Sequence, residues 1–129
     1  MPGFEERAVC RAPAQEVWKL LYDPARFCEW WAGWERVEPG EGGAVTRFDR
    51  RWPDFAYPTN VSTRREEGRV VVSCQLSDIV HEWVIEPATE GCALLVRVDL
   101  PAEESERLED QRADVRESLR RLVARAEEG

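Results

Sequence analysis

The chain has 129 residues, 43% of them apolar and 34% charged, which suffices for one hydrophobic core and leaves none for a second domain. Its formal net charge of −8 repels phosphate backbones and anionic headgroups, so nucleic acid is excluded as a partner class. With no apolar run of about 18 residues and no signal-peptide core near its start, we expect a cytoplasmic protein without membrane insertion.

The first third of the chain predicts one strand followed by two short helices. Residues 4–11 alternate loosely between apolar and polar side chains and predict a strand. Apolar residues then recur at helical spacing over residues 14–22, after a proline suited to a first helical turn. Asp23-Pro24 pairs a good N-cap with a good first-turn residue, which predicts a second short helix.

After Gly33 the apolar period changes to two, and turn residues divide the chain into six further strands. The connections rich in Gly, Pro and Glu are short, which favours antiparallel neighbours over helical crossovers. The predicted strands are residues 35–38, 44–51, 57–65, 69–76, 79–86 and 92–100.

A long amphipathic helix is predicted from Pro101 to about Ala126, because the segment contains neither Pro nor Gly after that proline. Near its start, Gln111 and Arg112 border the apolar stripe. Either this end meets a space of mixed polarity, or its first turn is frayed by solvent. The stripe itself consists of Leu108, Val115, Leu119, Leu122 and Ala126.

The four cysteines indicate neither a metal site nor a disulfide framework. Cys10, Cys28, Cys74 and Cys92 are widely separated, form no C-x-x-C pair and share the chain with a single histidine. Cytoplasmic thiols stay reduced, and we expect these to be mostly buried. The sequence predicts no metal and no cofactor.

Residues 12–31, which read APAQEVWKLLYDPARFCEWW, resemble the opening of START-like proteins. This group is also called the SRPBCC superfamily of polyketide cyclases/dehydrases and lipid-transport proteins. The shared theme is an A-P-A-x-x-V-W helix, a D-P turn and an F-x-x-W second helix. Gly42-Gly43, Trp83 and the turn at residues 87–91 extend the resemblance over nearly the whole chain.

The resemblance implies an α+β helix-grip fold, formed as a single domain over residues 1–129. In this fold a curved antiparallel sheet of about seven strands wraps around the long C-terminal helix, and two short helices follow the first strand. The resemblance also implies a cavity between sheet and helix that takes hydrophobic ligands. Relatives include cyclases, ligand carriers and a branch resembling the Hsp90 activator, which binds a protein.

We therefore expect binding or carriage of a small hydrophobic molecule in an internal cavity. One alternative is an aromatase/cyclase-type enzyme acting on a polyketide-like substrate, and a second is a protein-interaction module like the Hsp90 activator. No catalytic motif such as G-x-S-x-G or a phosphate-binding glycine loop occurs, so enzymatic activity stays an open question.

The first candidate site residues lie on the 79–86 strand. Ile79, His81, Trp83 and Ile85 share one face, which should point inward. His81 is the only imidazole of the chain and is a wall residue, a ligand contact or a proton donor or acceptor. Trp83 is either core or a stacking surface for a flat ligand.

The 44–51 strand has no cleanly apolar face, so its orientation stays open. Arg47 and Asp49 form either a charge pair in a mixed-polarity cavity, where they join His81 as weak catalytic candidates, or a solvated pair on an edge strand. Tyr57 and Thr59 place hydroxyl groups near the same end. The remaining predicted ligand-binding residues are Cys74, Leu94, Leu108 and Gln111.

Several aromatic residues fall in the second helix and in loops, where polar residues are the default. Trp30 is expected to anchor the second helix to the sheet, as the family pattern implies. The others are candidates for a gate at the cavity entrance or for a partner surface. They are Trp31, Trp34, Trp52 and Phe55.

Overall fold

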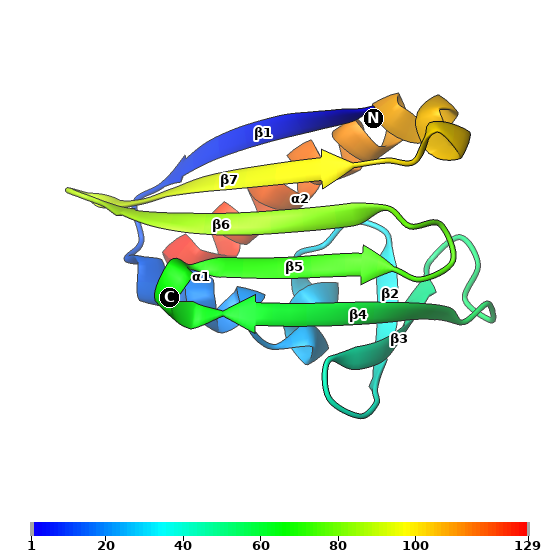
Figure 1. Cartoon of the computed structure of the whole chain (residues 1–129). Helices are drawn as coiled ribbons and strands as arrows, with labels where there is room; N and C mark the ends of the chain where they lie inside the picture. The colour runs from blue at the N-terminus through cyan, green and yellow to red at the C-terminus, as the bar shows by residue number, and fades with distance from the viewer. Residues whose placement is uncertain (1, 129) are drawn as a thin grey trace.

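The computed structural model describes residues 2–128, and the strands in this range form one antiparallel sheet (Figure 1). Their order is β1-β7-β6-β5-β4-β3-β2, which leaves β1 and β2 at the free edges. Met1 and Gly129, the ends of the predicted domain, lie outside the described residues. The strands are β1 (Gly3–Cys10), β2 (Trp34–Pro39), β3 (Ala44–Asp49), β4 (Tyr57–Arg64), β5 (Arg69–Cys74), β6 (Val80–Ala88) and β7 (Gly91–Asp99).

Two helical segments follow β1, and a long helix ends the described chain, as the sequence predicts. The first is α1 (Ala14–Leu21), and the second is the 3-10 helix η1 (Pro24–Glu29). The Asp23 carboxylate caps η1 by accepting a hydrogen bond from the backbone N–H of Ala25 at 3.0 Å. The remaining helices are η2 (Arg65–Glu67), η3 (Ala102–Arg107) and α2 (Leu108–Glu128).

The α+β fold class and the predicted strands are confirmed, and each strand end differs from its predicted position by at most two residues. The regular alternation of β6 explains why that strand could be oriented from its sequence. His81, Trp83 and Ile85 are buried, whereas Val80, Glu82 and Val84 on the other face are only half-buried. The predicted inward face of this strand is therefore confirmed.

Helix α2 runs behind the sheet in Figure 1 and packs its apolar stripe against it. Val115, Leu119, Leu122 and Ala126 are all buried, as predicted. Ser118 lies among them without exposure to solvent. Its hydroxyl accepts a hydrogen bond from the Ala32 N–H at 2.9 Å and donates one to the Asp114 carbonyl at 2.7 Å. This hydroxyl therefore connects α2 to the segment that follows η1.

Two ion-pair clusters hold α2 against the rest of the chain. Glu6 of β1 accepts hydrogen bonds from Arg112 at 2.9 Å and from Arg116 at 3.1 Å. Burial opposes ionisation of Glu6, but the two arginines outweigh it and hold the pKa of this carboxyl below its usual value. Nearer the end of α2, Arg125 donates to Glu29 of η1 at 2.8 Å. The helix is thus fixed at both ends.

Aromatic side chains fill the interior beneath the sheet. Neighbouring rings in this cluster have centroids 4.5 to 5.5 Å apart. The Trp30 indole N–H donates to the Leu20 carbonyl at 3.0 Å, which ties η1 to α1. Trp30 also packs edge-on against Trp83 of β6, so it anchors η1 to the sheet as expected. The cluster consists of Phe27, Trp30, Trp31, Trp34 and Trp83.

The expectation of an aromatic gate is wrong for Trp31 and Trp34, which are only 4% and 3% exposed. The segment after η1 turns back beneath the sheet, so these indoles become part of the core. Trp52 and Phe55, in the β3–β4 connection, are 59% and 51% exposed. Only these two of the four candidates lie on the surface.

Two further expectations are corrected by the strand arrangement. Because β3 pairs with β2 on one side and β4 on the other, it is an inner strand, and the solvated-edge interpretation of Arg47 and Asp49 is wrong. Leu76 closes the predicted 69–76 strand, but β5 ends at Cys74 and Leu76 is exposed in the following turn.

The cysteines are all free thiols, and three of them are buried. Cys10 and Cys92 face each other across β1 and β7, Cys74 ends β5, and Cys28 on η1 is half-buried. Burial raises the pKa of the Cys92 thiol to about 11, and neighbouring Cys10 adds to this shift.

Within residues 2–128, no helix has the length and apolar character needed to span a membrane.

Candidate functional site

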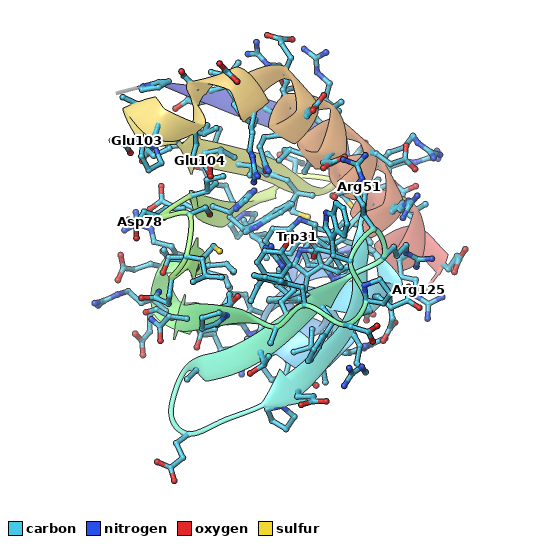
Figure 2. The ribbon with its side chains drawn as sticks, turned by 90° about the vertical axis from the view of Figure 1, so that its right-hand side faces the viewer. Trp31, Arg51, Asp78, Glu103, Glu104 and Arg125 are labelled. Carbon is cyan, nitrogen blue, oxygen red and sulfur yellow. The ribbon has the colours of Figure 1, made fainter. Side chains whose placement is uncertain are left out.

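A cavity of about 120 Å³ lies between the inner face of the sheet, the start of α2 and the segment after η1. Figure 2 shows Trp31 in this interior, with α2 on one side and the strands on the other. Polar side chains from β3, β4, β6 and α2 meet here, although they are far apart in the sequence. The lining consists of Trp31, Ala32, Gly33, Trp34, Arg47, Asp49, Tyr57, Val72, Cys74, Ser77, Ile79, His81, Arg107, Gln111 and Asp114.

Arg47 and Asp49 form an ion pair on the inner face of β3. The Arg47 Nε atom lies 2.9 Å from Asp49 Oδ1, but its N–H is poorly directed and makes no hydrogen bond. The guanidinium donates only one long hydrogen bond within this pair, from Nη2 to Asp49 Oδ2 at 3.4 Å. A guanidinium carries five N–H donors, so this half-buried group keeps donors available to a ligand.

Two aromatic rings hold the Arg47 guanidinium in place. Its central carbon lies 4.4 Å from the ring centroid of Tyr57 and 5.3 Å from that of Trp34. Contacts of this kind attract the cation to the ring faces. The arginine is therefore oriented by its neighbours before any ligand arrives.

His81 lies next to this pair on the wall formed by β6. Its ring meets the Trp31 indole edge-on, with centroids 5.0 Å apart. Burial and, to a smaller extent, the positive charge of Arg47 lower the pKa of His81 to about 3, although Gln111 of α2 opposes the shift. At neutral pH the imidazole is uncharged, so it can accept or donate a hydrogen bond but is not a cationic acid.

Two carboxylates complete the polar lining. Burial raises the pKa of Asp49 despite its pairing with Arg47. Asp114, at the exposed rim, also has a raised pKa, because of partial desolvation and the nearby negative charge of Asp110 and Asp49. The raised pKa values of both carboxyl groups indicate that a further negative charge would be unfavourable in these surroundings.

The structure brings six of the predicted site residues to this cavity: His81, Arg47, Asp49, Tyr57, Cys74 and Gln111. Four others do not line it. Trp83 and Leu94 are packed in the core, Leu108 is only partly buried, and Thr59 turns its hydroxyl to the Tyr57 carbonyl at 3.1 Å. Whether any of these residues contacts a ligand stays a prediction.

Sequence reasoning assigned Trp31 and Trp34 to a gate or a partner surface and not to the cavity wall, and it missed Arg107 and Asp114 as lining residues. Asp114 falls three positions after Gln111, which is the helical spacing that puts two side chains on one face. That spacing could have indicated Asp114 once Gln111 was chosen. Within residues 2–128, no group of three or more His, Cys, Asp or Glu side chains is placed to hold a metal ion.

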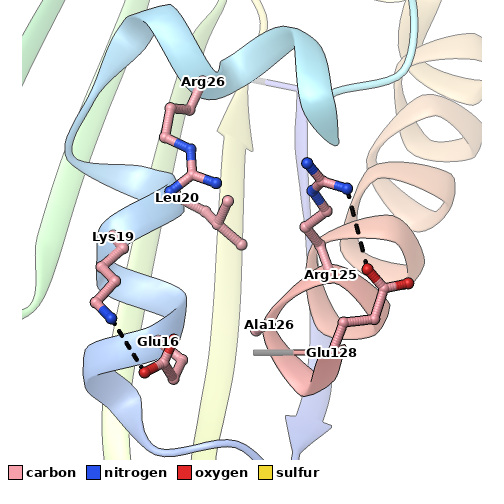
Figure 3. Close-up of a pocket in the computed structure, with 7 residues that line it drawn as sticks. All are labelled: Glu16, Lys19, Leu20, Arg26, Arg125, Ala126 and Glu128. Atoms are coloured by element: carbon pink, nitrogen blue, oxygen red, sulfur yellow. Dashed lines mark hydrogen bonds and ion pairs between the residues drawn. The ribbon is translucent and has the colours of Figure 1, made fainter.

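A larger groove of about 430 Å³ lies between α1, η1 and the end of α2 (Figure 3). Its three basic side chains are already paired with carboxylates. Lys19 lies 3.2 Å from Glu16, Arg125 lies 4.0 Å from Glu128, and Arg26 is engaged by Glu29. The groove is open, and its positive charges are already neutralised. The smaller cavity, in which Arg47 has unused donors, is therefore the stronger candidate for a ligand site.

Replacing His81 with glutamine should make stability less dependent on pH. Above pH 6.5 the imidazole is neutral in both folded and unfolded chains. As the pH falls toward the folded pKa of about 3, only the unfolded chain takes up the proton, so wild type loses stability. The loss approaches about 1.4 kcal/mol per pH unit. The glutamine variant lacks this contribution.

Urea denaturation at pH 6 and pH 5 measures the difference. The carboxylates titrate in both proteins, so their contribution cancels in the comparison. Equal losses of unfolding free energy in wild type and His81→Gln would show that this imidazole is not kept neutral by burial.

A curved antiparallel sheet that grips a helix over a lined cavity defines the helix-grip class of ligand-binding folds. The family model described as polyketide cyclase / dehydrase and lipid transport matches residues 1–127, and the chain belongs to this family. Among functionally curated proteins, none matches this chain.

Solved structures share the fold at low sequence identity. The di-domain ARO/CYC BexL from the BE-7585A biosynthetic pathway has a TM-score of 0.80 and 17% identity, covering 98% of this chain and 47% of that protein. The di-domain ARO/CYC StfQ from the steffimycin biosynthetic pathway gives 0.76 and 16%, covering 98% and 50%. A protein from Nitrosospira multiformis gives 0.78 and 16%, covering 95% and 94%.

Proposed function

We propose that the whole chain acts as one ligand-binding unit and holds a small molecule in the cavity between α2 and the sheet. The observation that carries this proposal is the Arg47 guanidinium, oriented by Trp34 and Tyr57 yet left with unused donors. Polar groups that converge in a recess with aromatic walls are typical of small-molecule sites.

The size of the cavity favours a small ligand over a lipid. Pockets for drug-sized molecules usually enclose about 300 to 1,000 Å³, whereas this cavity has about 120 Å³. The buried indoles of Trp31 and Trp34 stack on each other and form part of the wall of this cavity. Carriage of a long acyl chain would need these indoles to move.

An aromatase/cyclase-type activity is the second candidate, supported by the likeness to BexL and StfQ. In this function the Asp49 carboxylate, whose pKa burial raises, would take the substrate proton as the base, and the neutral His81, a weak base at its lowered pKa, would accept or donate a hydrogen bond. The substrate would have to be far shorter than a polyketide of several rings. The protein-interaction alternative has lost support, because only Trp52 and Phe55 of the expected surface are exposed.

Native mass spectrometry of the purified protein tests the proposal. We expect a fraction of wild type to carry an added mass that solvent extraction releases. Arg47→Met, which keeps a long side chain without its donors, should lose that mass, and Trp52→Ala, outside the cavity, should retain it. A wild-type protein with no added mass, and no change in melting temperature with a broad panel of small molecules, would contradict the proposal.

A further inference from the structure

The charges that line the cavity cancel. Arg47 and Arg107 are positive, and Asp49 and Asp114 are negative. A bound anion would lie beside two carboxylates whose pKa values are already raised, and a bound cation would lie beside Arg47 in desolvated surroundings. Burying an extra unpaired charge is costly in either case. The cavity therefore favours an uncharged ligand.

The Arg47–Asp49 pair presents a donor beside an acceptor. Its single long hydrogen bond and the poorly directed Nε leave the guanidinium free to donate elsewhere, and within residues 2–128 the Asp49 carboxylate accepts only that one side-chain hydrogen bond. A ligand whose carbonyl oxygen lies next to an N–H or O–H can accept a hydrogen bond from Arg47 and donate one to Asp49 at the same time. Such a group, conjugated with a ring, is planar and suits the flat walls made by Trp34 and Tyr57.

Trp31 limits the size of the ligand. Its indole stacks on Trp34 with centroids 4.5 Å apart and meets His81 edge-on. It lines the cavity and is 4% exposed. The remaining space of about 120 Å³ is well below the range of about 300 to 1,000 Å³ that is usual for drug-sized ligands, which favours one ring over two.

We propose that the cavity selects an uncharged, planar molecule of about one ring, whose carbonyl oxygen accepts from Arg47 and whose adjacent N–H or O–H donates to Asp49, with Trp31 as the residue that sets the size limit. This inference rests on the proposed function, since it names the class of ligand for the same site.

Three compounds of nearly equal shape test the charge preference: benzamide is neutral, benzoate is an anion and benzamidine is a cation. Binding to wild type is measured by calorimetry and tryptophan fluorescence. We expect benzamide to bind at least about tenfold more tightly than the other two, as one hydrogen bond to a charged group is worth at least that factor.

The Asp49→Asn variant is expected to gain affinity for benzoate, and a folding defect cannot produce such a gain. Without its counter-ion, Arg47 should bind an anion. Benzoate should therefore bind this variant at least about tenfold more tightly than it binds wild type, and it should become the preferred compound. Glu90→Gln, which removes an exposed carboxylate in the β6–β7 turn, is the matched control and should keep the wild-type order.

The size limit is tested with 2-naphthamide, which adds one ring to benzamide. Wild type should bind it at least about tenfold more weakly than benzamide, whereas Trp31→Ala should bind both compounds comparably. Trp31→Phe, a milder change, should retain benzamide binding and show an intermediate preference even if the alanine variant does not fold.

Several results would overturn the inference. These are benzoate or benzamidine binding wild type as tightly as benzamide, an unchanged order in Asp49→Asn, or equal binding of 2-naphthamide and benzamide to wild type. If none of the compounds binds but the native protein carries an extractable molecule, the inference fails and the proposed function stands. If no molecule is carried either, both fail.

Discussion

Replacing Val115 with aspartate is expected to destabilise the protein by about 3 to 5 kcal/mol. Val115 has no exposure to solvent and lies on the face of α2 that packs against the sheet. An aspartate here would either bury an unpaired carboxylate or force the helix off the sheet. Since small domains are stable by only about 5 to 15 kcal/mol, urea denaturation should show a large loss of unfolding free energy.

Ala113→Asp is the matched control, because it introduces the same carboxylate two positions earlier on the exposed side of α2. A change of only about 1 kcal/mol is expected there, since aspartate is a weaker helix former than alanine and would lie four residues from Glu109 and Glu117. An equally small change for Val115→Asp would mean that α2 is not docked on the sheet in solution.

Gly91→Ala should destabilise the protein by about 3 kcal/mol or more. Gly91 starts β7 with a φ of +116°, in a region that other residues rarely adopt, and a Cβ at this position would overlap the carbonyl oxygen of Cys10. The backbones of β1 and β7 would have to separate where Cys10 pairs with Cys92. Thermal and urea denaturation measure the loss.

The Gly42→Ala variant separates the cost of backbone strain at a positive φ from the cost of a steric overlap. Gly42 also has a positive φ, of +61°, but a Cβ there would have open space around it. Only backbone strain remains, which costs about 1 kcal/mol. Should both variants lose the same free energy, the close approach to Cys10 would not be the reason for glycine at position 91.

The strands and helices could be predicted from sequence because their signals are local. On β6 the inward residues alternate strictly, and Asp23-Pro24 combines a cap with a first-turn residue. Such patterns specify an element and its buried face without reference to the rest of the chain. The stripe on α2 was predictable for the same reason.

The cavity was less predictable because its walls come from distant segments. Arg47 has no local feature that assigns it to an inner strand, and its position follows only once β2 and β4 pair on either side. Trp31 and Trp34 looked like surface aromatics, since the sequence does not indicate that the chain after η1 turns inward. The small size of the cavity is a consequence of that turn.

The pairing of β1 with β7 has a consequence for the order of folding. The first strand finds its partner only after some ninety further residues, with Gly3 opposite Asp99. During synthesis β1 must therefore remain unpaired until β7 has been made, while the hairpins from β2 to β6 can already form. Closing such a long loop is slow. The sheet is thus completed last at the strand that is made first.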